Sequence, residues 1–469
     1  HRDLHSFPTR RSSDLVTIGT KVKEVYPQWF GAKGDNLSDD TIAIQSCFDS
    51  MVSGGCIFFP QGEYKVARTL GVNDCWGVKL TNSNIKISGH NACIKRYDSD
   101  ISSFTLAYPV LFIGTPDNDA ALATENITIE NITFEGNDTR HNIPGNTPSD
   151  FRYAIEFKNT KNTLVNNCAF TVIDSIAIHY QQPVSYAYRT SAFYNTTKNY
   201  DSKIIDCKFY AIPHEVPGRA LIHAISLGGI DNCVVDGCYF EWCDDAIAGV
   251  GTYQDMTNVA DSTYTPSQAA WTLGVVKRSG RNWKIINNTC INSSEHALYL
   301  AGCNVIVHNN SIISEDTNCN GDIKIRSQNA IVKNNNIRCK ESCIGISEGS
   351  KDVLVEGNIC LSEGTFSGGV IGLSTMELVT YINNRAYLDG YFMMENIRII
   401  NNTISLPDTA PTDPVNHLHY GIRVYTPASS ITQYPTGTVR NIIIQGNTIK
   451  SCVAAIALYG AIGLNVDIT

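Results

Sequence analysis

Short stretches of alternating apolar and polar residues recur along most of the chain. Such period-two alternation is typical of β-strands that bury one face. Four of these stretches resemble one another: His223-Ala-Ile-Ser-Leu227, Asp245-Ala-Ile-Ala-Gly249, His296-Ala-Leu-Tyr-Leu300 and Gly321-Asp-Ile-Lys-Ile-Arg326. Aligning their buried positions makes four residues equivalent: Ile225, Ile247, Leu298 and Ile323. The spacings of 22, 51 and 25 residues predict strands in successive coils, the longest one spanning either two coils or one coil with an insertion.

The same alignment gathers ionisable side chains into columns. One column holds His223, Asp245 and His296, and the column beside it holds Asp244 and Glu295. An outward-facing column further along the strands contains Ser226, Ala248, Tyr299 and Lys324. Ionisable groups aligned on one face of a repeated structure indicate where chemistry takes place.

A second pattern recurs from residue 126 onward: an Ile/Val-rich phrase, then Asn-Asn or Gly-Asn, then a small and an apolar residue. Copies include Asn166-Asn, Asn287-Asn, Asn309-Asn, Asn335-Asn, Gly357-Asn, Asn401-Asn and Gly446-Asn. Asn tolerates left-handed backbone and suits sharp bends, and stacked Asn side chains can form ladders. Clean copies 20–27 residues apart predict a solenoid in which each coil buries its neighbour.

The pattern differs in residues 16–75, which we expect to form a separate N-terminal module. Ile44, Cys47, Phe48 and Met51 mark one face of a helix that Ser38 or Asp39 would cap. Gly54-Gly55 would end this helix, and Cys56–Phe59 reads as a strand before the turn at Pro60-Gln-Gly62.

Motifs in this module carry a family resemblance. Trp29-Phe-Gly-Ala-Lys-Gly-Asp35, then Asp39-Asp-Thr-x-Ala-Ile-Gln45 and Phe59-Pro-x-Gly-x-Tyr64, resemble the opening of the pectate-lyase superfamily, which includes polygalacturonase- and rhamnogalacturonase-like proteins. The run beginning Tyr26-Pro-x-Trp most resembles bacteriophage tailspikes and polysaccharide depolymerases. The resemblance implies an all-β, single-stranded right-handed parallel β-helix with an N-terminal capping helix, in which Asp35, Asp39 and Asp40 are structural. It also implies a homotrimer in an extracellular or virion-associated location.

Residues 76–469 are expected to form the β-helix, which three insertions interrupt near 181–200, 251–280 and 405–419. The first two insertions are rich in aromatic residues, and the second contains Tyr253 and Trp271. Loops that leave a rigid scaffold usually build its binding face, and aromatic rings stack on sugars. The insertions therefore predict a carbohydrate groove, although each ring could instead hold its own loop in place.

Composition narrows the range of partners. A net charge of −9 and a pI near 5.7 argue against nucleic acid, because no basic stripe is present to neutralise phosphates. No apolar run reaches the roughly 18 residues that cross a bilayer, so we expect no membrane insertion. Many of the 16 cysteines lie inside strand phrases, which favours free core thiols over disulfides. No pair has convincing zinc spacing, and we predict neither a metal site nor a cofactor.

The first fifteen residues do not resemble the sequence of a natural protein. His5-Ser-Phe-Pro-Thr-Arg-Arg-Ser-Ser-Asp-Leu15 back-translates, with permitted codons, into a common short-read sequencing adapter. We therefore expect residues 1–15 to be a non-native artefact that makes no packed contacts.

The order of charged motifs is similar to that of polygalacturonases. Those enzymes carry Asp-Asp, Gly-His-Gly and Arg-Ile-Lys in successive coils; this chain carries Asp244-Asp245, Glu295-His296 and Lys324-Ile-Arg326. The glycines that flank the histidine are absent, Lys and Arg are exchanged, and no Asn-Thr-Asp precedes the Asp pair. The resemblance here covers about a hundred residues of the sequence.

Two reactions fit these residues. Glycoside hydrolysis, which we favour at this stage, needs two carboxyls, and Asp244, Asp245 and Glu295 would supply them. Close like charges would raise the pKa of one carboxyl, and His296 or His223 would relay a proton. Lys324 and Arg326 would bind a substrate carboxylate or sulfate, and further binding residues would be His223, Tyr299, Tyr253 and Trp271.

The alternative reaction is β-elimination on a uronic acid. Arg326 or Lys324 would then neutralise the carboxylate, and His296 or Tyr299 would move the proton. In both cases the predicted substrate is a polysaccharide from a bacterial surface. Two non-enzymatic hypotheses also stand: an adhesin that only binds in the same groove, and a structural β-helix subunit.

Overall fold

The computed structural model describes most of the coiled part of the chain. The described residues are 23–67, 76–96, 109–115, 123–136, 153–173, 176–181, 199–211, 223–249, 280–316, 319–347, 350–363, 369–374, 394–406, 420–425, 439–452, 454–459 and 466–469. Residues 1–15, most of the three insertions, and both Tyr253 and Trp271 lie outside these ranges.

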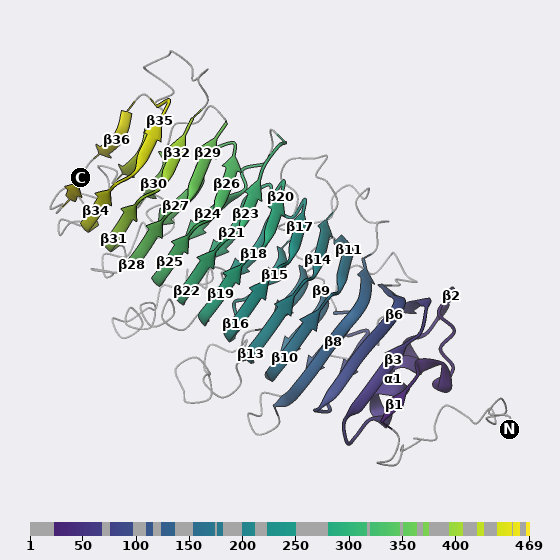
Figure 1. Ribbon diagram of the computed structural model, residues 1–469. Helices are drawn as coiled ribbons and strands as arrows, with labels where there is room; N and C mark the ends of the chain where they lie inside the picture. Colours follow the sequence, from purple (N-terminus) through teal and green to yellow (C-terminus); the bar gives the residue numbers. More distant parts are fainter. Residues whose placement is uncertain are drawn as a thin grey trace, which may run out of the picture.

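The chain winds into an elongated solenoid whose strands stack, coil upon coil, in three parallel columns (Figure 1). We call these columns faces A, B and C. The predicted right-handed parallel β-helix is confirmed. Figure 1 shows the coils following one another along the long axis, with β1 near one end of the solenoid and β36 near the other.

Face A contains fourteen described strands, each paired in parallel with the next. They are β1 (Glu24–Val25), β3 (Gly55–Phe59), β6 (Ile85–Arg96), β8 (Thr124–Glu135), β10 (Thr160–Asn166), β13 (Asn199–Ile205), β16 (Ile230–Asp236), β19 (Arg281–Ile286), β22 (Cys303–His308), β25 (Gln328–Lys333), β28 (Lys351–Glu356), β31 (Met394–Ile400), β34 (Val439–Gln445) and β37 (Val466–Ile468).

Face B follows face A within each coil, and the long strands β6 and β8 run across both faces. Its remaining strands are β2 (Asp35–Asp39), β4 (Gly62–Val66), β11 (Ala169–Ile173), β14 (Lys208–Ala211), β17 (Tyr239–Glu241), β20 (Thr289–Ile291), β23 (Ser311–Ile313), β26 (Asn336–Cys339), β29 (Ile359–Ser362), β32 (Thr403–Ser405) and β35 (Thr448–Lys450).

Face C completes each coil and forms a twelve-stranded sheet among the described residues. Its strands are β5 (Val78–Leu80), β7 (Leu111–Gly114), β9 (Tyr153–Lys158), β12 (Ile176–Tyr180), β15 (His223–Ser226), β18 (Asp245–Gly249), β21 (His296–Leu300), β24 (Asp322–Ile325), β27 (Ile344–Ser347), β30 (Gly369–Ser374), β33 (Tyr420–Tyr425) and β36 (Ala454–Tyr459).

The core lies between the three faces and consists of side chains stacked in register. Four phenylalanine rings stack nearly parallel along the axis, with centroids 4.8–5.3 Å apart: Phe134, Phe170, Phe209 and Phe240. Cys168, Cys207, Cys238 and Cys290 are also buried and carry free thiols, which confirms the prediction of core cysteines. The alternation seen in the sequence therefore reflects one face of every strand packing into this interior.

The N-terminal module forms as predicted, apart from its cap. Helix α1 (Thr41–Ser50) follows the short 3-10 helix η1 (Pro27–Phe30) and buries the predicted face of Ile44, Cys47 and Phe48. The expectation that Ser38 or Asp39 is the N-cap residue is wrong, because the cap position belongs to Asp40.

Asp39 and Asp40 make different hydrogen bonds at the start of this helix. Asp39 accepts the backbone N–H of Thr41, while the buried Asp40 turns away and accepts the N–H groups of Lys33 and Gly34. Burial raises the pKa of Asp40 despite these hydrogen bonds. The Asp40 carboxylate holds the loop at Lys33 and Gly34, so Asp40 makes no side-chain capping hydrogen bond to the helix although it occupies the N-cap position. Residue preferences at helix N-termini do not reveal this arrangement.

The recurring Asn-Asn motif forms the corner between faces A and B. In most copies the first residue adopts left-handed backbone, with φ of 56° at Asn287 and Asn309. Two copies are displaced by one residue: the left-handed residue is Asn167 in Asn166-Asn, and it is Asn334, one position earlier, at Asn335-Asn. From residue 288 onward, the residue after the left-handed one bonds through its side-chain amide to that of the next coil at 2.9–3.0 Å, in a continuous ladder that is buried apart from the half-buried Asn447: Asn288, Asn310, Asn335, Asn358, Asn402 and Asn447. The predicted ladder is confirmed.

A second, exposed asparagine ladder was not singled out in the sequence. Asn232, Asn282, Asn304 and Asn329 all have φ between 53° and 58°, and their amides bond from coil to coil at 2.7–3.1 Å. This ladder crosses face A, where the left-handed residue interrupts the strand alternation. The two ladders fix the register of successive coils from both inside and outside the solenoid.

Candidate functional site

The four similar phrases form β15, β18, β21 and β24 on successive coils of face C. Backbone pairing places Ile225 opposite Ile247, Ile247 opposite Leu298, and Leu298 opposite Ile323, as the alignment predicted. Since β18 pairs directly with β21, the 51-residue spacing is one coil with an insertion rather than two coils. The same pairing places His223, Asp245 and His296 in one column.

This column gains a fourth member that the sequence did not reveal. The register shifts between His296 and Leu298, and this irregularity brings Asp322 opposite His296. Without the shift, the pairing of Ile323 with Leu298 would set Asp322 opposite Ala297. Asp322 stood in one of the aligned phrases, but only the bulge assigns it to the column.

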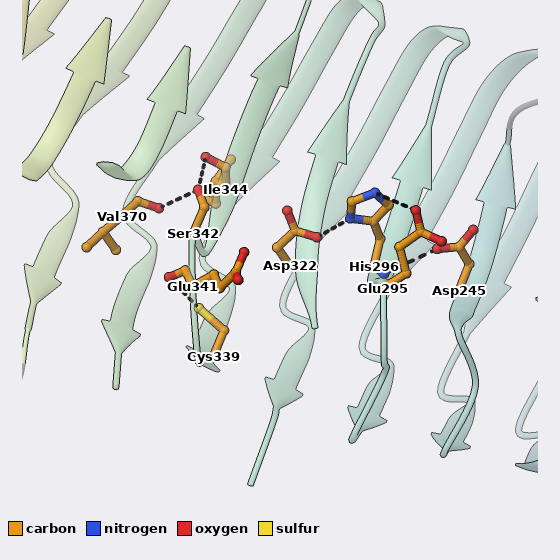
Figure 2. A network of polar contacts seen from close by, with 9 residues as sticks. All are labelled: Asp245, Glu295, His296, Asp322, Cys339, Glu341, Ser342, Ile344 and Val370. Atoms are coloured by element: carbon orange, nitrogen blue, oxygen red, sulfur yellow. Dashed lines mark hydrogen bonds and ion pairs between the residues drawn. The ribbon is translucent and has the colours of Figure 1, made fainter. Parts of the chain in front are cut away.

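His296 lies at the centre of the cluster (Figure 2). Its Nδ1 lies 2.5 Å from Asp322 Oδ1, and its Nε2 lies 3.9 Å from Glu295 Oε1. Its backbone N–H donates to Asp245 Oδ1 at 3.2 Å. Ala297 and Leu298 next to it are fully buried, so the strand anchors the imidazole from the inside while the ring points outward.

The aspartate pair lies deeper than His296. Asp244 accepts a hydrogen bond from Ser294 Oγ, and Asp245 Oδ2 lies 3.1 Å from His223 Nε2. The side chain of Asp245 is only 3% exposed, against 16% for His296 and 51% for Glu295. The groups that an incoming substrate meets first are therefore Glu295 and His296 rather than the two aspartates.

Burial and neighbouring charge compete at the two histidines. Burial is the largest single effect on His223 and disfavours its imidazolium, but Asp245, Asp244 and Glu295 together outweigh burial, so the pKa of His223 is raised. At His296 burial again has the largest effect, and Asp322 and Asp245 together outweigh it, so the pKa of His296 is raised. Burial also raises the pKa of the Glu295 carboxyl, with help from the charge of Asp245.

Of the predicted binding residues, Tyr299 and Lys324 lie in the next outward column. Tyr299 and Lys324 are backbone partners on β21 and β24, and the Tyr299 ring lies edge-on to His296 with centroids 5.1 Å apart. The guanidinium carbon of Arg326 lies 5.2 Å from the centre of the Tyr299 ring. Lys324 is close enough for its charge to oppose protonation of His296. Lys324 is therefore the cation that acts on the imidazole, whereas Arg326 is buried and lies against Tyr299.

Glu341 is a further acidic residue that the sequence did not single out. It lies in the turn between β26 and β27, beyond Asp322 in Figure 2. Burial raises the pKa of its carboxyl, and the charge of Asp322 adds to this. Glu341 belongs to no aligned strand phrase, so no periodic signal marks it.

The described residues contain no group of three or more His, Cys, Asp or Glu side chains arranged to hold a metal ion. Within the same part of the chain, no helix is long and apolar enough to cross a membrane.

Comparison with known proteins supports the family resemblance of the opening module. Residues 28–98 match a family model described as rhamnogalacturonase A/epimerase, pectate lyase-like, so the predicted resemblance to the pectate-lyase superfamily is confirmed over this part of the chain. Alginate lyase 7 of Azotobacter vinelandii is 29% identical over 142 residues, which cover 27% of this chain and 15% of that protein. The chain thus matches only a small part of this relative.

Solved structures share the architecture of most of the chain. The A-module of the Azotobacter vinelandii mannuronan C-5 epimerase AlgE6 superposes with a TM-score of 0.58 at 13% identity, over 95% of this chain and 99% of that one. The Streptococcus pneumoniae surface adhesin PfbA gives 0.58 at 15% identity, over 93% and 100%. A tailspike of E. coli bacteriophage HK620, solved with a pentasaccharide, gives 0.55 at 14%, over 93% and 78%. At these identities the likeness establishes the parallel β-helix fold alone.

Proposed function

We propose that this protein cleaves an acidic polysaccharide on face C by β-elimination beside a uronate carboxylate. The observation that supports it most is that His296, hydrogen-bonded to Asp322 on the next strand, contacts Tyr299 and lies within the influence of the Lys324 charge. The similarity to an alginate lyase and to a mannuronan epimerase module supports a uronate polymer as the substrate class.

The geometry assigns a role to each group. Asp322 accepts the Nδ1–H of His296, which leaves the lone pair on the outward-facing Nε2 to act as a base. Lys324 and Arg326 would bind the uronate carboxylate and stabilise the charge that develops on it. Nε2 would remove the proton at C5, the C5 electron pair would form the C4=C5 double bond, and the C4–O bond would break. Tyr299 would donate a proton to the departing oxygen.

Glycoside hydrolysis is the second candidate, and Glu295 is the observation that favours it. This carboxyl is half exposed, and its pKa is raised by burial and by Asp245, as a general acid requires. The second carboxyl would have to come from Asp244 or Asp245. Because both are buried and already in contact with Ser294 or His223, we rank hydrolysis below elimination. Binding without cleavage, as in an adhesin, is the third candidate.

The variant His296→Gln tests the proposal. Loss of a general base lowers the rate by about 10²–10⁴-fold, so cleavage of the polymer should nearly cease. The matched control is His90→Gln, which removes an exposed histidine on β6 and should leave activity unchanged. The product identifies the reaction: elimination gives ultraviolet absorbance from the new double bond, whereas hydrolysis gives reducing ends without it. Full activity of His296→Gln would contradict the proposal.

We also propose that the protein works outside the cell or on a virion, as a homotrimer. The structural similarity to a phage tailspike and to a bacterial surface adhesin supports this location. Light scattering after size-exclusion chromatography checks the trimer, and a monomer mass would contradict it.

A further inference from the structure

We propose that Cys339 and Cys343 form a disulfide when the protein is oxidised, and that this bond restrains the turn that carries Glu341 beside the candidate site. Both cysteines have free thiols in the structure. The bond does not depend on the proposed reaction. The proposed location, outside the cell or on a virion, supplies the oxidising surroundings in which disulfides persist.

The two sulfur atoms already lie close together. The Sγ atoms of Cys339 and Cys343 are 2.8 Å apart, and both side chains are fully buried. Non-bonded carbon atoms pack at about 3.5–4.0 Å, and sulfur is larger than carbon, so this contact is shorter than ordinary packing. An S–S bond measures about 2.05 Å, so the two atoms need to approach by less than about 1 Å.

Backbone hydrogen bonds hold both cysteines in position. Cys339 is the last residue of β26, and its carbonyl accepts the N–H of Glu363 at 2.8 Å. Cys343 immediately precedes β27; its N–H donates to Val370 O at 2.8 Å, and its carbonyl accepts the N–H of Ile323 at 3.0 Å. The neighbouring coils therefore fix both ends of the turn at residues 340–342, and small adjustments of the two side chains are enough to close the bond.

The turn between the two cysteines joins them to the candidate site. Figure 2 shows Cys339 and Glu341 beyond Asp322, on the side away from His296. Burial raises the pKa of Glu341, Asp322 adds to this effect and His296 opposes it, so the three groups interact electrostatically. In the thiol form, Cys339 Sγ donates to Glu341 O at 3.3 Å. A covalent bond across the turn replaces this weak contact and limits how far Glu341 moves from the other two groups.

The oxidant that we assign is a small-molecule disulfide such as oxidised glutathione. The thiolate of Cys339 attacks one sulfur of the oxidant, which forms a mixed disulfide and releases one glutathione thiol. The thiolate of Cys343 then attacks Cys339 Sγ, closes the protein disulfide and releases the second glutathione thiol. The two electrons and two protons that the protein loses are gained by the two glutathione molecules.

Burial makes this exchange slow once the chain has folded. The reacting species is the thiolate, and burial, together with the neighbouring thiols of Cys339 and Cys360, raises the pKa of Cys343. We therefore expect the bond to form while this coil packs, before the thiols are covered. Oxidised glutathione added to the folded, reduced protein should react much more slowly than the same reagent present during folding.

Peptide mapping of protein folded with oxidised glutathione tests the bond. Free thiols are alkylated with iodoacetamide in denaturant, and the protein is digested with trypsin without reduction. Trypsin cleaves after Lys340, between the two cysteines, so the bond should join the peptide that ends in Lys340 to the one that begins at Glu341. Full alkylation of Cys339 and Cys343, or a link from either of them to Cys360, would overturn the proposal. The same mapping on protein expressed in an oxidising periplasm makes the test independent of refolding.

Hydrogen exchange followed by mass spectrometry tests the restraint. Amides of residues 340–344 should exchange about tenfold more slowly in the oxidised protein than in the reduced one. Cys343→Ser should abolish this difference, and Cys343→Ala replaces it if the buried hydroxyl prevents folding. The matched control is Cys290→Ala, which removes another buried thiol and should keep the difference. Equal exchange in the oxidised and reduced wild type would overturn the restraint.

Neither measurement uses the cleavage of a polysaccharide. A protein that forms the disulfide but cleaves nothing therefore contradicts the proposed reaction alone. A protein that cleaves the polymer while Cys339 and Cys343 stay fully alkylated contradicts the disulfide alone.

Discussion

At the scale of single residues, the charge of His296 is the property on which the site depends. Asp322 raises the pKa of His296 against the opposing effect of burial, and Asp245 does the same for His223. A base with a raised pKa is free to accept a proton only at higher pH. We therefore expect elimination to become faster as the pH rises through the raised pKa of His296.

The same shift makes stability depend on pH. A histidine whose folded pKa lies above its ordinary value of 6.5 stabilises the fold fully below that pH, and this contribution is lost as the pH rises through the folded pKa. In Asp322→Asn the imidazole stays buried without its carboxylate, so its pKa should fall. The difference in Tm between wild type and Asp322→Asn should therefore be largest below pH 6.5 and shrink at higher pH.

Two measurements check this prediction. Thermal melts across the pH range give the difference in Tm, and NMR titration of the histidine ring protons gives the pKa directly. Asp49→Asn, an exposed change on α1, serves as the control and should shift neither. A pH-independent difference in Tm, or an unchanged His296 pKa, would show that Asp322 does not control this proton.

At the scale of elements, the corner between faces A and B depends on two adjacent asparagines with different roles. Asn335 accepts from the backbone N–H and the side-chain amide of Asn310, both at 2.9 Å, and donates to Val307 O and Asn358 Oδ1. Asn334 instead supplies a φ of 55°, the conformation that Gly357 supplies in the next coil. One residue provides buried hydrogen bonds, and the other provides backbone geometry.

This division predicts opposite outcomes for neighbouring substitutions. Asn335→Ala leaves buried donors and an acceptor without partners, and each costs about 1–3 kcal/mol, so the free energy of unfolding should fall by several kcal/mol. Asn334→Gly keeps the left-handed backbone and should change stability by less than about 1 kcal/mol. Denaturant melts measure both variants. Equal losses at the two positions would show that the ladder contributes no more than the turn.

Sequence reasoning reached the strands of the site because each strand repeats a buried pattern. Ile225, Ile247 and Leu298 fix the register, and the register alone is enough to set His223, Asp245 and His296 in one column. The sequence did not place Asp322 in this column, because a bulge shifts the strand pairing by one residue and a periodic pattern contains no sign of a bulge. The sequence did not identify Glu341 as part of the site, because this residue lies in a turn, where no alternation indicates which way a side chain points.

At the scale of the whole molecule, repeated motifs determine the fold of the solenoid, whereas single charged side chains on face C form its candidate site. The opening motif and the asparagine period predicted the β-helix, because each coil repeats the same local physics. Net charge, a sum over all residues, does not show where a single cation lies, whereas strand pairing places Lys324 opposite Tyr299 on face C. The predicted aromatic groove of Tyr253 and Trp271 stays a prediction.

Because each coil packs only on its neighbours, damage at one end of a solenoid should stay local. Phe48 is buried in α1 against the first coils, and Phe48→Ala removes about 3–5 kcal/mol of packing there. Hydrogen exchange followed by mass spectrometry should then accelerate in β3 and β4 and remain unchanged in β21 and β24. Leu298→Ala, a buried change in β21, should produce the reverse pattern and lower activity. If Phe48→Ala instead accelerated exchange along the whole solenoid, the coils would unfold as a single unit, and the cap would control the candidate site from the far end of the molecule.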